Sequence, residues 1–358
     1  MSGGGAELFS ADYGPLDRLL HRLALSSSAV GEAAFQVEKS LYGRRCPADD
    51  GRHVFVAGLA RAGTTLLLRL LYDSGEFSSL TYRDMPFVLA PNLWRPLAAG
   101  SRRKGETAER AHGDGVLVDV DSPEALEEVF WRVHCGASYL RPDRLVPMTA
   151  GDEVIADFRL YVRLILLRHG GRRYLSKNNN NILRLAALAE AFPRALVLIP
   201  FRHPLDQAGS LRQQHLRFTA RQGQDAFELA YMNWLAHHEF GLGHRPFLWP
   251  GESPPDLSRD DINYWLWLWT QVYGKLLGYL PAAPANTLLF SYDRFCDAPA
   301  EVWRGLAQRA ELAEGLPAAM AVRPAARKPV PLVDSGLLAA ASALYEQLTA
   351  QALCPPAQ

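Results

Sequence analysis

Short apolar runs alternate with longer helical patterns, and this alternation most restricts what the chain can fold into. The run Ala195–Phe201 is continuously apolar, which is typical of a strand buried on both faces of a parallel sheet. Shorter runs predict further strands at Val54–Leu59, Arg173–Ser176 and Thr287–Tyr292. Because strands separated by helices form parallel sheets with helices on both faces, we expect an α/β fold with a central parallel sheet. The helices are expected at Thr65–Tyr72, Pro123–Cys135, Asp152–His169, Asn181–Phe192, Pro204 to about His215, Ile262–Leu280 and Ser335–Ala352.

The 358 residues contain no internal repeat and no low-complexity linker, which favours a single domain over residues 1–358. Residues 1–50 would form a helical extension before the first strand. Two segments break the alternation of strands and helices: residues 92–121 are rich in glycine and arginine, and residues 245–260 hold four prolines. We expect residues 92–121 and 218–260 to be insertions beside a ligand site.

Bulk composition restricts the class of function. Lys plus Arg and Asp plus Glu each number 38, so the formal net charge is zero, and this balance gives no support for nucleic-acid binding. The four cysteines are scattered without a CxxC pair, so neither a zinc cluster nor a disulfide framework is expected. Residues 1–10 lack the features of a secretory signal, and no apolar run approaches the roughly 20 residues of a membrane-spanning helix. We therefore predict a cytoplasmic protein.

A glycine-containing loop follows the first predicted strand and leads into a helix. At a helix N-terminus, unpaired N–H groups and a partial positive charge favour an anion. Gly63 would let the backbone approach a phosphate closely, and Thr64 and Thr65 would add hydroxyl donors. The spacing from Gly58 matches the nucleotide loop GxxxxGK[ST], except that Thr64 replaces the lysine and Arg61 supplies a positive charge within the loop.

The missing lysine helps to distinguish an NTPase from an enzyme that uses a different phosphate-containing donor. An NTPase uses that lysine, together with magnesium, on the β- and γ-phosphates. A donor with one bridging phosphate and a terminal sulfate needs less charge compensation. A tight turn that binds nothing is the alternative, and Arg61 with its two threonine neighbours favours a ligand.

A second anion site is predicted where the strand Ala195–Phe201 ends. Arg202 follows this strand directly, at the edge where open α/β sheets bind ligands. Ser210 lies eight residues later, about two turns into the next helix, so both side chains could hold one phosphate. An ion pair between Arg202 and a carboxylate such as Asp206 is the alternative.

Together the two segments resemble the PAPS-dependent sulfotransferase family, in the style of its bacterial and tyrosylprotein-type members (PAPS is 3′-phosphoadenosine 5′-phosphosulfate). The family pattern [KR]-[SA]-G-T-T is matched at residues 61–65, and the pattern Arg-x-Pro with a later serine is matched at residues 202–210. The resemblance is firm over residues 51–94 and 173–215, weaker at 287–295 and absent elsewhere. It implies a P-loop-like fold with PAPS as the donor, PAP as the product and no metal requirement. It assigns the phosphosulfate to Arg61, Ala62, Gly63, Thr64 and Thr65, and the 3′-phosphate to Arg202 and Ser210, with Arg327 and Lys328 in a late basic loop.

Three side chains are expected to act on the reacting groups. The Arg61 guanidinium stays charged and can bind the sulfate and the bridging oxygen at once. Lys177 resembles, by its place, the lysine before the 3′ signature in tyrosylprotein-type members, so it would contact the transferring sulfate. Asp84 falls where glycan-type and tyrosylprotein-type members carry a carboxylate base, although a surface pair with Arg83 is the alternative. The run Asn178–Asn181 departs from those relatives, and helix capping is its expected use.

The resemblance predicts an enzyme that transfers a sulfuryl group from PAPS to a hydroxyl or amine. Residues 92–121 and 218–260 would form the acceptor site, and their composition suits a small molecule, a glycan, a lipid or a peptide. No nucleic-acid partner and no membrane span are expected, and a homodimer is left open. Two other functions also remain open: a nucleoside or sugar kinase with a degenerate loop, and a non-catalytic nucleotide-binding protein.

Overall fold

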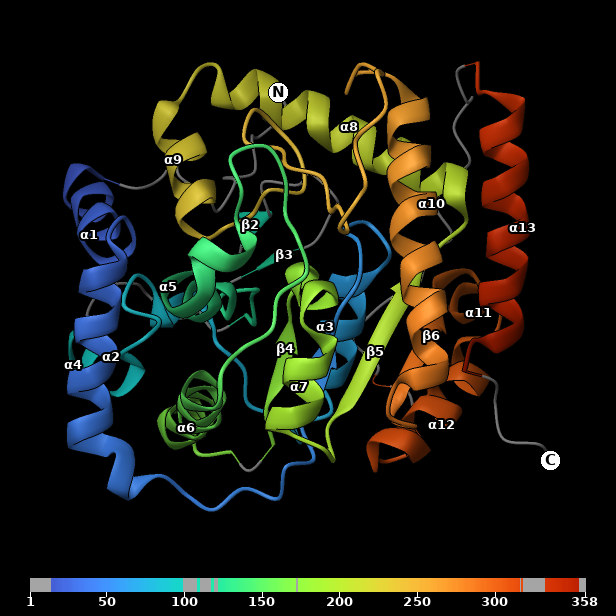
Figure 1. Ribbon diagram of the computed structural model, residues 1–358. Helices are drawn as coiled ribbons and strands as arrows, with labels where there is room; N and C mark the ends of the chain where they lie inside the picture. The colour runs from blue at the N-terminus through green and yellow to red at the C-terminus, as the bar shows by residue number, and fades with distance from the viewer. Residues whose placement is uncertain are drawn as a thin grey trace, which may run out of the picture.

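A four-stranded parallel sheet, in the order β4-β1-β5-β6, forms the centre of the molecule, and helices cover both of its faces (Figure 1). The strands are β1 (Val54–Val56), β4 (Leu175–Lys177), β5 (Leu196–Phe201) and β6 (Thr287–Ser291). This arrangement confirms the predicted α/β fold. The computed structural model describes residues 14–98, 108–109, 117–118, 122–171, 173–315, 317 and 332–353.

Thirteen α-helices are present in the described part of the chain, with short 3₁₀ turns between some of them. A small antiparallel pair, β2 (Ala108–Glu109) and β3 (Leu117–Val118), lies apart from the main sheet. The 3₁₀ turns are η2 (Gly43–Arg45), η3 (Tyr82–Asp84), η4 (Asn179–Leu183) and η5 (Leu280–Ala282). The helices are α1 (Pro15–Leu25), α2 (Ser28–Tyr42), α3 (Thr64–Tyr72), α4 (Pro91–Ala98), α5 (Glu128–Tyr139), α6 (Asp152–His169), α7 (Leu185–Ala191), α8 (Pro204–Gln222), α9 (Ala226–Trp234), α10 (Ile262–Tyr279), α11 (Tyr292–Asp297), α12 (Pro299–Ala310) and α13 (Ser335–Gln351).

Alternate side chains of the central strand pack into two different apolar cores. Val54 and Val56 belong to the core formed with α3 and α12, whereas Phe55 belongs to the larger core formed with α5, α6 and α10. All three side chains are fully buried. Burial on both faces explains why the strands are apolar without interruption.

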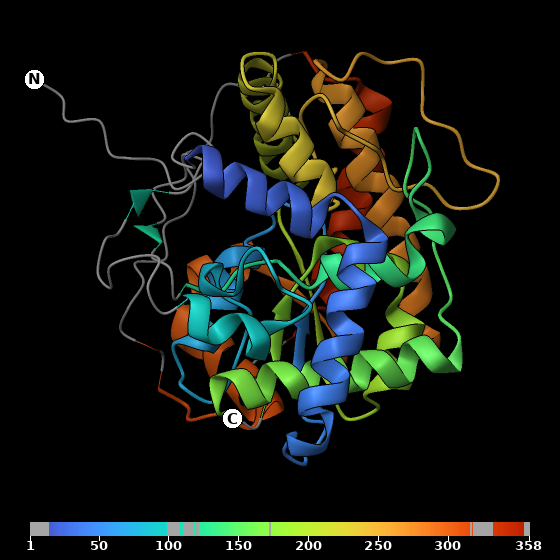
Figure 2. The ribbon, with the colours of Figure 1, turned by 90° about the vertical axis from the view of Figure 1, so that its left-hand side faces the viewer.

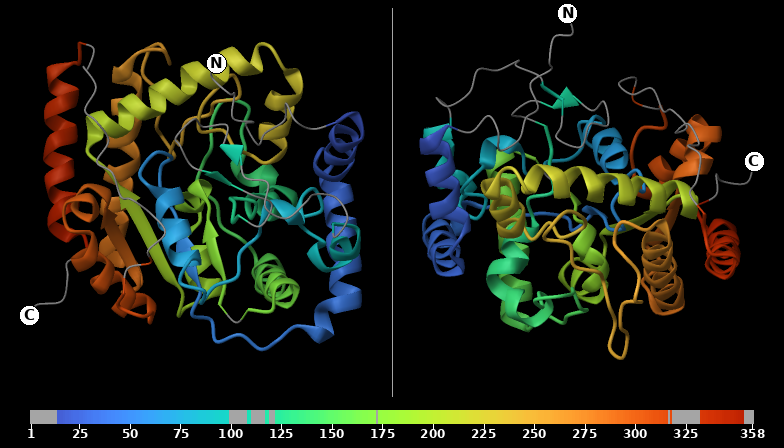
Figure 3. Two further views of the ribbon diagram at one scale, coloured as in Figure 1. Left: turned by 180° about the vertical axis from the view of Figure 1, so that it is seen from behind. Right: turned by 90° about the horizontal axis from the view of Figure 1, so that it is seen from above.

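Strand pairing brings the carboxyl ends of the strands together at one edge of the sheet. Val56 of β1 lies opposite Lys177 of β4 on one side and Leu198 of β5 on the other. On the outer side of β4, Ser78 forms a parallel bridge with Tyr174. The chain that leads from Ser78 to η3 therefore runs toward the same edge of the sheet. Helix α8 crosses above this edge (Figure 3). Residues that follow β1, β4, β5 and residue 78 are therefore close to one another.

Several helix boundaries differ from the prediction, and some helices were not predicted. The helix predicted from Pro123 begins at Glu128, because Pro123 instead forms an antiparallel bridge with Thr81. Helix α8 continues past His215, since Phe218 still packs into the core. Helix α9, within the predicted insertion 218–260, is absent from the prediction.

The N-terminal helices α1 and α2 lie on the outside of the molecule, and α1 runs beside α9 (Figure 2). Arg18 of α1 pairs with Asp225 at 3.0 Å, and its guanidinium lies 4.7 Å from the centre of the Phe227 ring. These contacts attach α1 to the start of α9. Among the described residues, no helix is both long enough and apolar enough to cross a lipid bilayer.

Candidate active site

The loop between β1 and α3 has the backbone of an anion-binding turn. Gly63 has a φ of 85° and Arg61 a φ of 68°, both in the left-handed region that non-glycine residues rarely adopt. No side chain caps the N-terminus of α3, so its first N–H groups face the loop. A Cβ on Gly58 would lie 3.0 Å from the carbonyl oxygen of Pro200, which shows how closely the loop approaches β5. This geometry suits an anion held by backbone N–H groups.

The two predicted anion motifs are in direct contact. The Nε of Arg61 donates a hydrogen bond to the Oγ of Ser210 at 3.0 Å. Ser210 lies on α8, which begins with Pro204 two residues after Arg202. The loop after β1 and the helix that follows β5 are therefore in contact.

The aromatic ring of Tyr292 lies between the two motifs. A Cβ on Gly63 would be 2.3 Å from Tyr292 Cδ2, and the guanidinium carbon of Arg202 lies 5.3 Å from the centre of the same ring. Burial raises the pKa of Tyr292 to about 12, so its hydroxyl stays protonated at neutral pH. The Nε of Arg202 is buried and has no hydrogen-bond partner within the described part of the chain. The sequence analysis assigned Tyr292 to a strand and missed this contact.

A cavity opens beside the phosphate loop, and four predicted site residues line it. Arg61, Thr64 and Thr65 line its loop end together with Lys177, the last residue of β4. The rest of the wall comes mainly from α8, α9 and the chain after α9, within the predicted insertion 218–260. That remaining wall combines apolar and aromatic side chains with three carboxylates: Ala60, Tyr82, Glu124, Leu126, Asn179, Phe218, Glu228, Tyr231, Met232, Leu235, His237, Glu239 and Phe240.

The remaining residues that were predicted to bind the donor do not line this cavity within the described part of the chain. Ala62 is fully buried within the loop. Arg327 and Lys328 lie outside the described residues, as does much of the predicted insertion 92–121. Among the residues that the structure describes, no group of three or more His, Cys, Asp or Glu side chains could hold a metal ion.

The structure does not bring Asp84 into the cavity, which corrects the prediction that it lies beside the reacting groups. Its side chain is 0 % exposed. Oδ2 accepts hydrogen bonds from the Thr81 backbone N–H at 2.9 Å and from the side chain of His169 at 3.0 Å. Oδ1 lies 3.3 Å from the Nε of Arg168. These contacts hold the turn of η3 and leave the carboxylate no access to a ligand.

Glu124 and Tyr82 form a hydrogen-bonded pair in the cavity wall. The Tyr82 hydroxyl donates to Glu124 Oε2 at 2.6 Å, and the backbone N–H of Ala125 donates to Oε1 at 2.8 Å. The backbone N–H of Glu124 donates to the Leu80 carbonyl at 3.0 Å, which attaches this segment to the sheet edge. The sequence pattern does not single out Glu124, because it predicts a helix starting at Pro123 that includes this residue.

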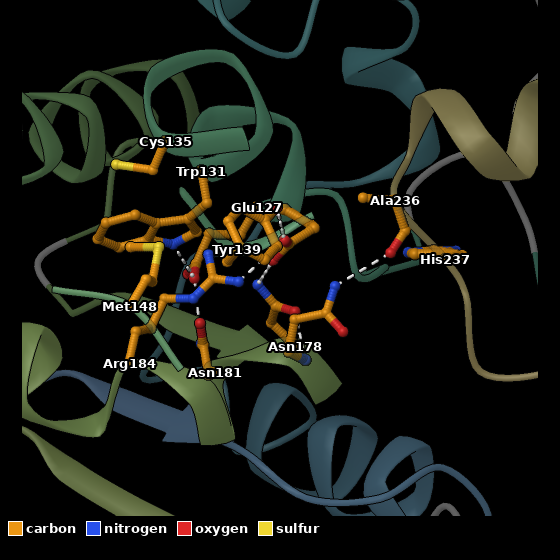
Figure 4. Close-up of polar contacts among 12 residues, drawn as sticks. Glu127, Trp131, Cys135, Tyr139, Met148, Asn178, Asn181, Arg184, Ala236 and His237 are labelled. Atoms are coloured by element: carbon orange, nitrogen blue, oxygen red, sulfur yellow. Dashed lines mark hydrogen bonds and ion pairs between the residues drawn. The ribbon is translucent and has the colours of Figure 1, made fainter. Parts of the chain in front are cut away.

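The four-asparagine run after Lys177 attaches the end of β4 to a buried acidic pair on α5 (Figure 4). Asn178 donates to Glu128 Oε2 at 2.7 Å, and Asn181 donates to Glu127 Oε1 at 3.1 Å. Glu128 also pairs with the fully buried Arg184 at 2.9 Å. Asn178 caps η4 as predicted, since its side chain accepts from the Asn180 N–H. Capping was expected for most of the run, but the side chains of the other three asparagines donate to more distant groups instead. The run therefore fixes the backbone next to Lys177.

Two hydrogen bonds hold the chain after α9, one of which ends at the carbonyl of Ala236 (Figure 4). Asn180 donates to the carbonyl of Ala236 at 3.0 Å, and Nε2 of His237 lies 3.1 Å from the carbonyl of Ala125. Ala236 has a φ of 51°, a left-handed conformation that turns the chain back toward the cavity. These contacts place the carboxylate of Glu239 in the cavity wall.

The model of the sulfotransferase family matches residues 53–245, a segment that contains β1, the phosphate loop, β4, β5 and α8. No curated protein matches the chain.

Solved structures with a similar fold include three bacterial sulfotransferases. Sulfotransferase STF1 from Mycobacterium tuberculosis H37Rv has 14% identity and a TM-score of 0.46, over 84% of this chain and 77% of its own. Sulfotransferase STF9 from Mycobacterium avium has 13% identity and a TM-score of 0.45, over 94% and 79%. A sulfotransferase from Alicyclobacillus acidocaldarius has 14% identity and a TM-score of 0.42, over 84% and 93%. Because the family model covers more than half of the 358 residues, this chain belongs to the sulfotransferase family.

Proposed function

We propose that this chain transfers a sulfuryl group from PAPS to a hydroxyl group of an acceptor. The contact between the two anion motifs carries the proposal: Arg61 donates to Ser210, and the Tyr292 ring separates Gly63 from Arg202. PAPS carries a phosphate on its ribose 3′ carbon and a phosphosulfate on its 5′ carbon, whereas ATP carries all its phosphates at one end. Two adjacent anion sites suit the two separated anionic groups of PAPS better than the single phosphate chain of ATP.

The groups around the two anion motifs divide the donor between them in this proposal. The N–H groups at the start of α3, with Thr64 and Thr65, would hold the 5′-phosphate. Arg61 and Lys177 would bind the sulfate and stabilise the charge that develops on the bridging oxygen. Arg202 would bind the 3′-phosphate, which would give its buried Nε a partner.

Glu124 takes the role of general base that the sequence analysis assigned to Asp84. It lines the same cavity as Arg61 and Lys177, and the Tyr82 hydroxyl fixes its orientation. As the acceptor oxygen bonds to sulfur, the bond from sulfur to the 5′-phosphate oxygen breaks and its electron pair stays on PAP. The acceptor proton passes to the Glu124 carboxylate.

A thermal-shift measurement tests the donor. A ligand that binds only the folded protein stabilises it by about 2.7 kcal/mol at one hundred times its Kd. PAP without magnesium should therefore raise the Tm by several degrees, and ATP with magnesium should not. Stabilisation by ATP alone would favour the kinase alternative, and PAP binding without sulfate transfer to any acceptor would favour a non-catalytic nucleotide-binding protein.

The Glu124→Gln variant tests the base. General-base catalysis contributes roughly 10²- to 10⁴-fold, so we expect kcat to fall at least about 10²-fold while the Kd of PAP changes little. Glu190→Gln, on the exposed surface of α7, is the matched control for the loss of one carboxylate. A kcat for Glu124→Gln close to that of the control would remove Glu124 from the mechanism.

A further inference from the structure

A buried amide oxygen in the cavity wall lacks a partner. Asn179 is only 4% exposed and lines the cavity. Its Nδ2 donates to Oε1 of Glu239 at 2.6 Å, which fixes the orientation of the amide because a carboxylate only accepts. Its Oδ1 has no hydrogen-bond partner within the described residues. Leaving such an atom unsatisfied costs about 1–3 kcal/mol. Asn180 and Asn181 also have an Oδ1 without a partner among the described residues, but of the three only Asn179 lines the cavity, so its Oδ1 is the one that a ligand with a hydrogen-bond donor can reach.

The carboxylate beside this oxygen is charged at neutral pH. Burial raises the pKa of Glu239, but the neighbouring His237 and Lys177 side chains and the hydrogen bond from Asn179 outweigh it and lower the pKa overall. In the proposed reaction the sulfate binds Lys177, which diverts the positive charge of this lysine toward the donor. Asn179 Oδ1 and Glu239 then form a pair of adjacent acceptors.

The surrounding wall has the chemistry of a cation site. Glu124 and Glu228 add two further carboxylates to the cavity, of which Glu228 is paired with Arg221 at 3.2 Å, and Tyr231 and Phe240 add aromatic rings that are at most 3% exposed. Aromatic faces attract cations within about 6 Å of the ring centre, more strongly where water is excluded. In the proposed reaction the sulfate occupies Arg61 and Lys177, so Glu124 and Glu239 are the charged groups left to face an acceptor. An anionic acceptor would lie beside these two carboxylates, so acidic peptides and sulfated or carboxylated glycans are disfavoured.

We propose that the acceptor of this enzyme carries a protonated amine, whose N–H groups bind Asn179 Oδ1 and Glu239 while its hydroxyl faces Glu124. An ammonium group has three donors and no acceptor, which matches a pair of acceptors in an acidic, aromatic wall. The acceptor class is therefore a small amino alcohol or an aminoalkyl phenol. This inference rests on the proposed transfer of a sulfuryl group from PAPS.

Three phenols of similar shape but different charge test the inference. Tyramine carries an ammonium group, 4-propylphenol replaces that group with a methyl group, and 3-(4-hydroxyphenyl)propanoate replaces it with a carboxylate. Transfer of labelled sulfate from PAPS to each phenol gives kcat/KM, and calorimetry with saturating PAP gives each Kd. We expect tyramine to exceed 4-propylphenol at least tenfold in kcat/KM, or in affinity if turnover is slow, and the propanoate to be the weakest.

Glu239→Gln shows whether this preference comes from the proposed site. The ratio of tyramine to 4-propylphenol should fall toward one in this variant, while Glu190→Gln should keep the wild-type ratio. A Tm shift with PAP shows that each variant is folded. The inference is overturned if wild type shows no preference for tyramine, in turnover or in binding, or if Glu239→Gln keeps that preference. Failure of PAP itself to bind would instead refute the proposed function.

Discussion

Replacing Gly63 with alanine tests whether the Tyr292 ring holds the geometry of the two anion motifs. Gly63 has a φ of 85°, and an added Cβ would lie 2.3 Å from Tyr292 Cδ2. The left-handed backbone costs alanine about 1–2 kcal/mol, and displacing a packed ring adds about 1–3 kcal/mol. We therefore expect Gly63→Ala to lower the free energy of unfolding by about 3 kcal/mol. Loss of the Arg202 stacking on the displaced ring should also weaken PAP binding, by up to roughly tenfold.

Gly75 offers a matched control for the strain alone. It has a φ of 78°, and an added Cβ would meet nothing within 4 Å. Gly75→Ala should therefore lose only about 1–2 kcal/mol and should bind PAP as wild type does. Urea denaturation gives the free energies of unfolding, and calorimetry gives the Kd of PAP. Equal destabilisation and equal PAP affinity in the Gly63 and Gly75 variants would refute the argument that Tyr292 supports the loop.

Three further predictions follow from contacts described above. Arg202→Ala should weaken PAP binding by roughly 10- to 100-fold, because it removes a hydrogen bond to a charged phosphate. Calorimetry should show little change in the binding of AMP, because AMP lacks the 3′-phosphate. Glu128→Ala should lower the free energy of unfolding by about 3–5 kcal/mol in urea denaturation, because it leaves the buried charge of Arg184 unpaired. Burial lowers the pKa of His244 to about 3, whereas a histidine in the unfolded chain has a pKa of about 6.5. Below about pH 6.5 the unfolded chain therefore binds a proton that the folded protein does not, and the free energy of unfolding should fall. Between pH 7.5 and pH 5, wild type should therefore lose about 2 kcal/mol more than His244→Phe, and equal losses would show that His244 does not stay neutral.

The central strands could be predicted because burial on both faces leaves a local pattern. The segment Ala195–Phe201 has no polar residue, and β5 covers nearly all of it. The end of β1 could not be predicted in the same way. The apolar run continues to Leu59, but the strand stops at Val56 because the chain turns into a loop that packs against Pro200.

Some residues of the candidate site are neighbours in the sequence, and others come together only in the folded chain. The loop residues are adjacent in sequence, so their spacing alone predicts an anion site. Glu124, Glu239 and Tyr292 reach the site through contacts between distant segments, which no local pattern contains. Asp84 lies in the segment expected to hold the base, but Arg168 at the end of α6 pairs with it, and this pairing depends on how α6 packs. The role of Lys177 and the binding of PAPS stay predictions.

The position of Tyr292 has a consequence for how the protein is made. The family segment ends at residue 245, yet the ring that closes the phosphate loop arrives only with β6 and α11. A growing chain that has left the ribosome as far as residue 245 would hold the whole matched segment and still lack the Tyr292 ring. Capture of the nucleotide would then require synthesis past β6, because the helix that follows this strand delivers the aromatic partner of the loop after β1.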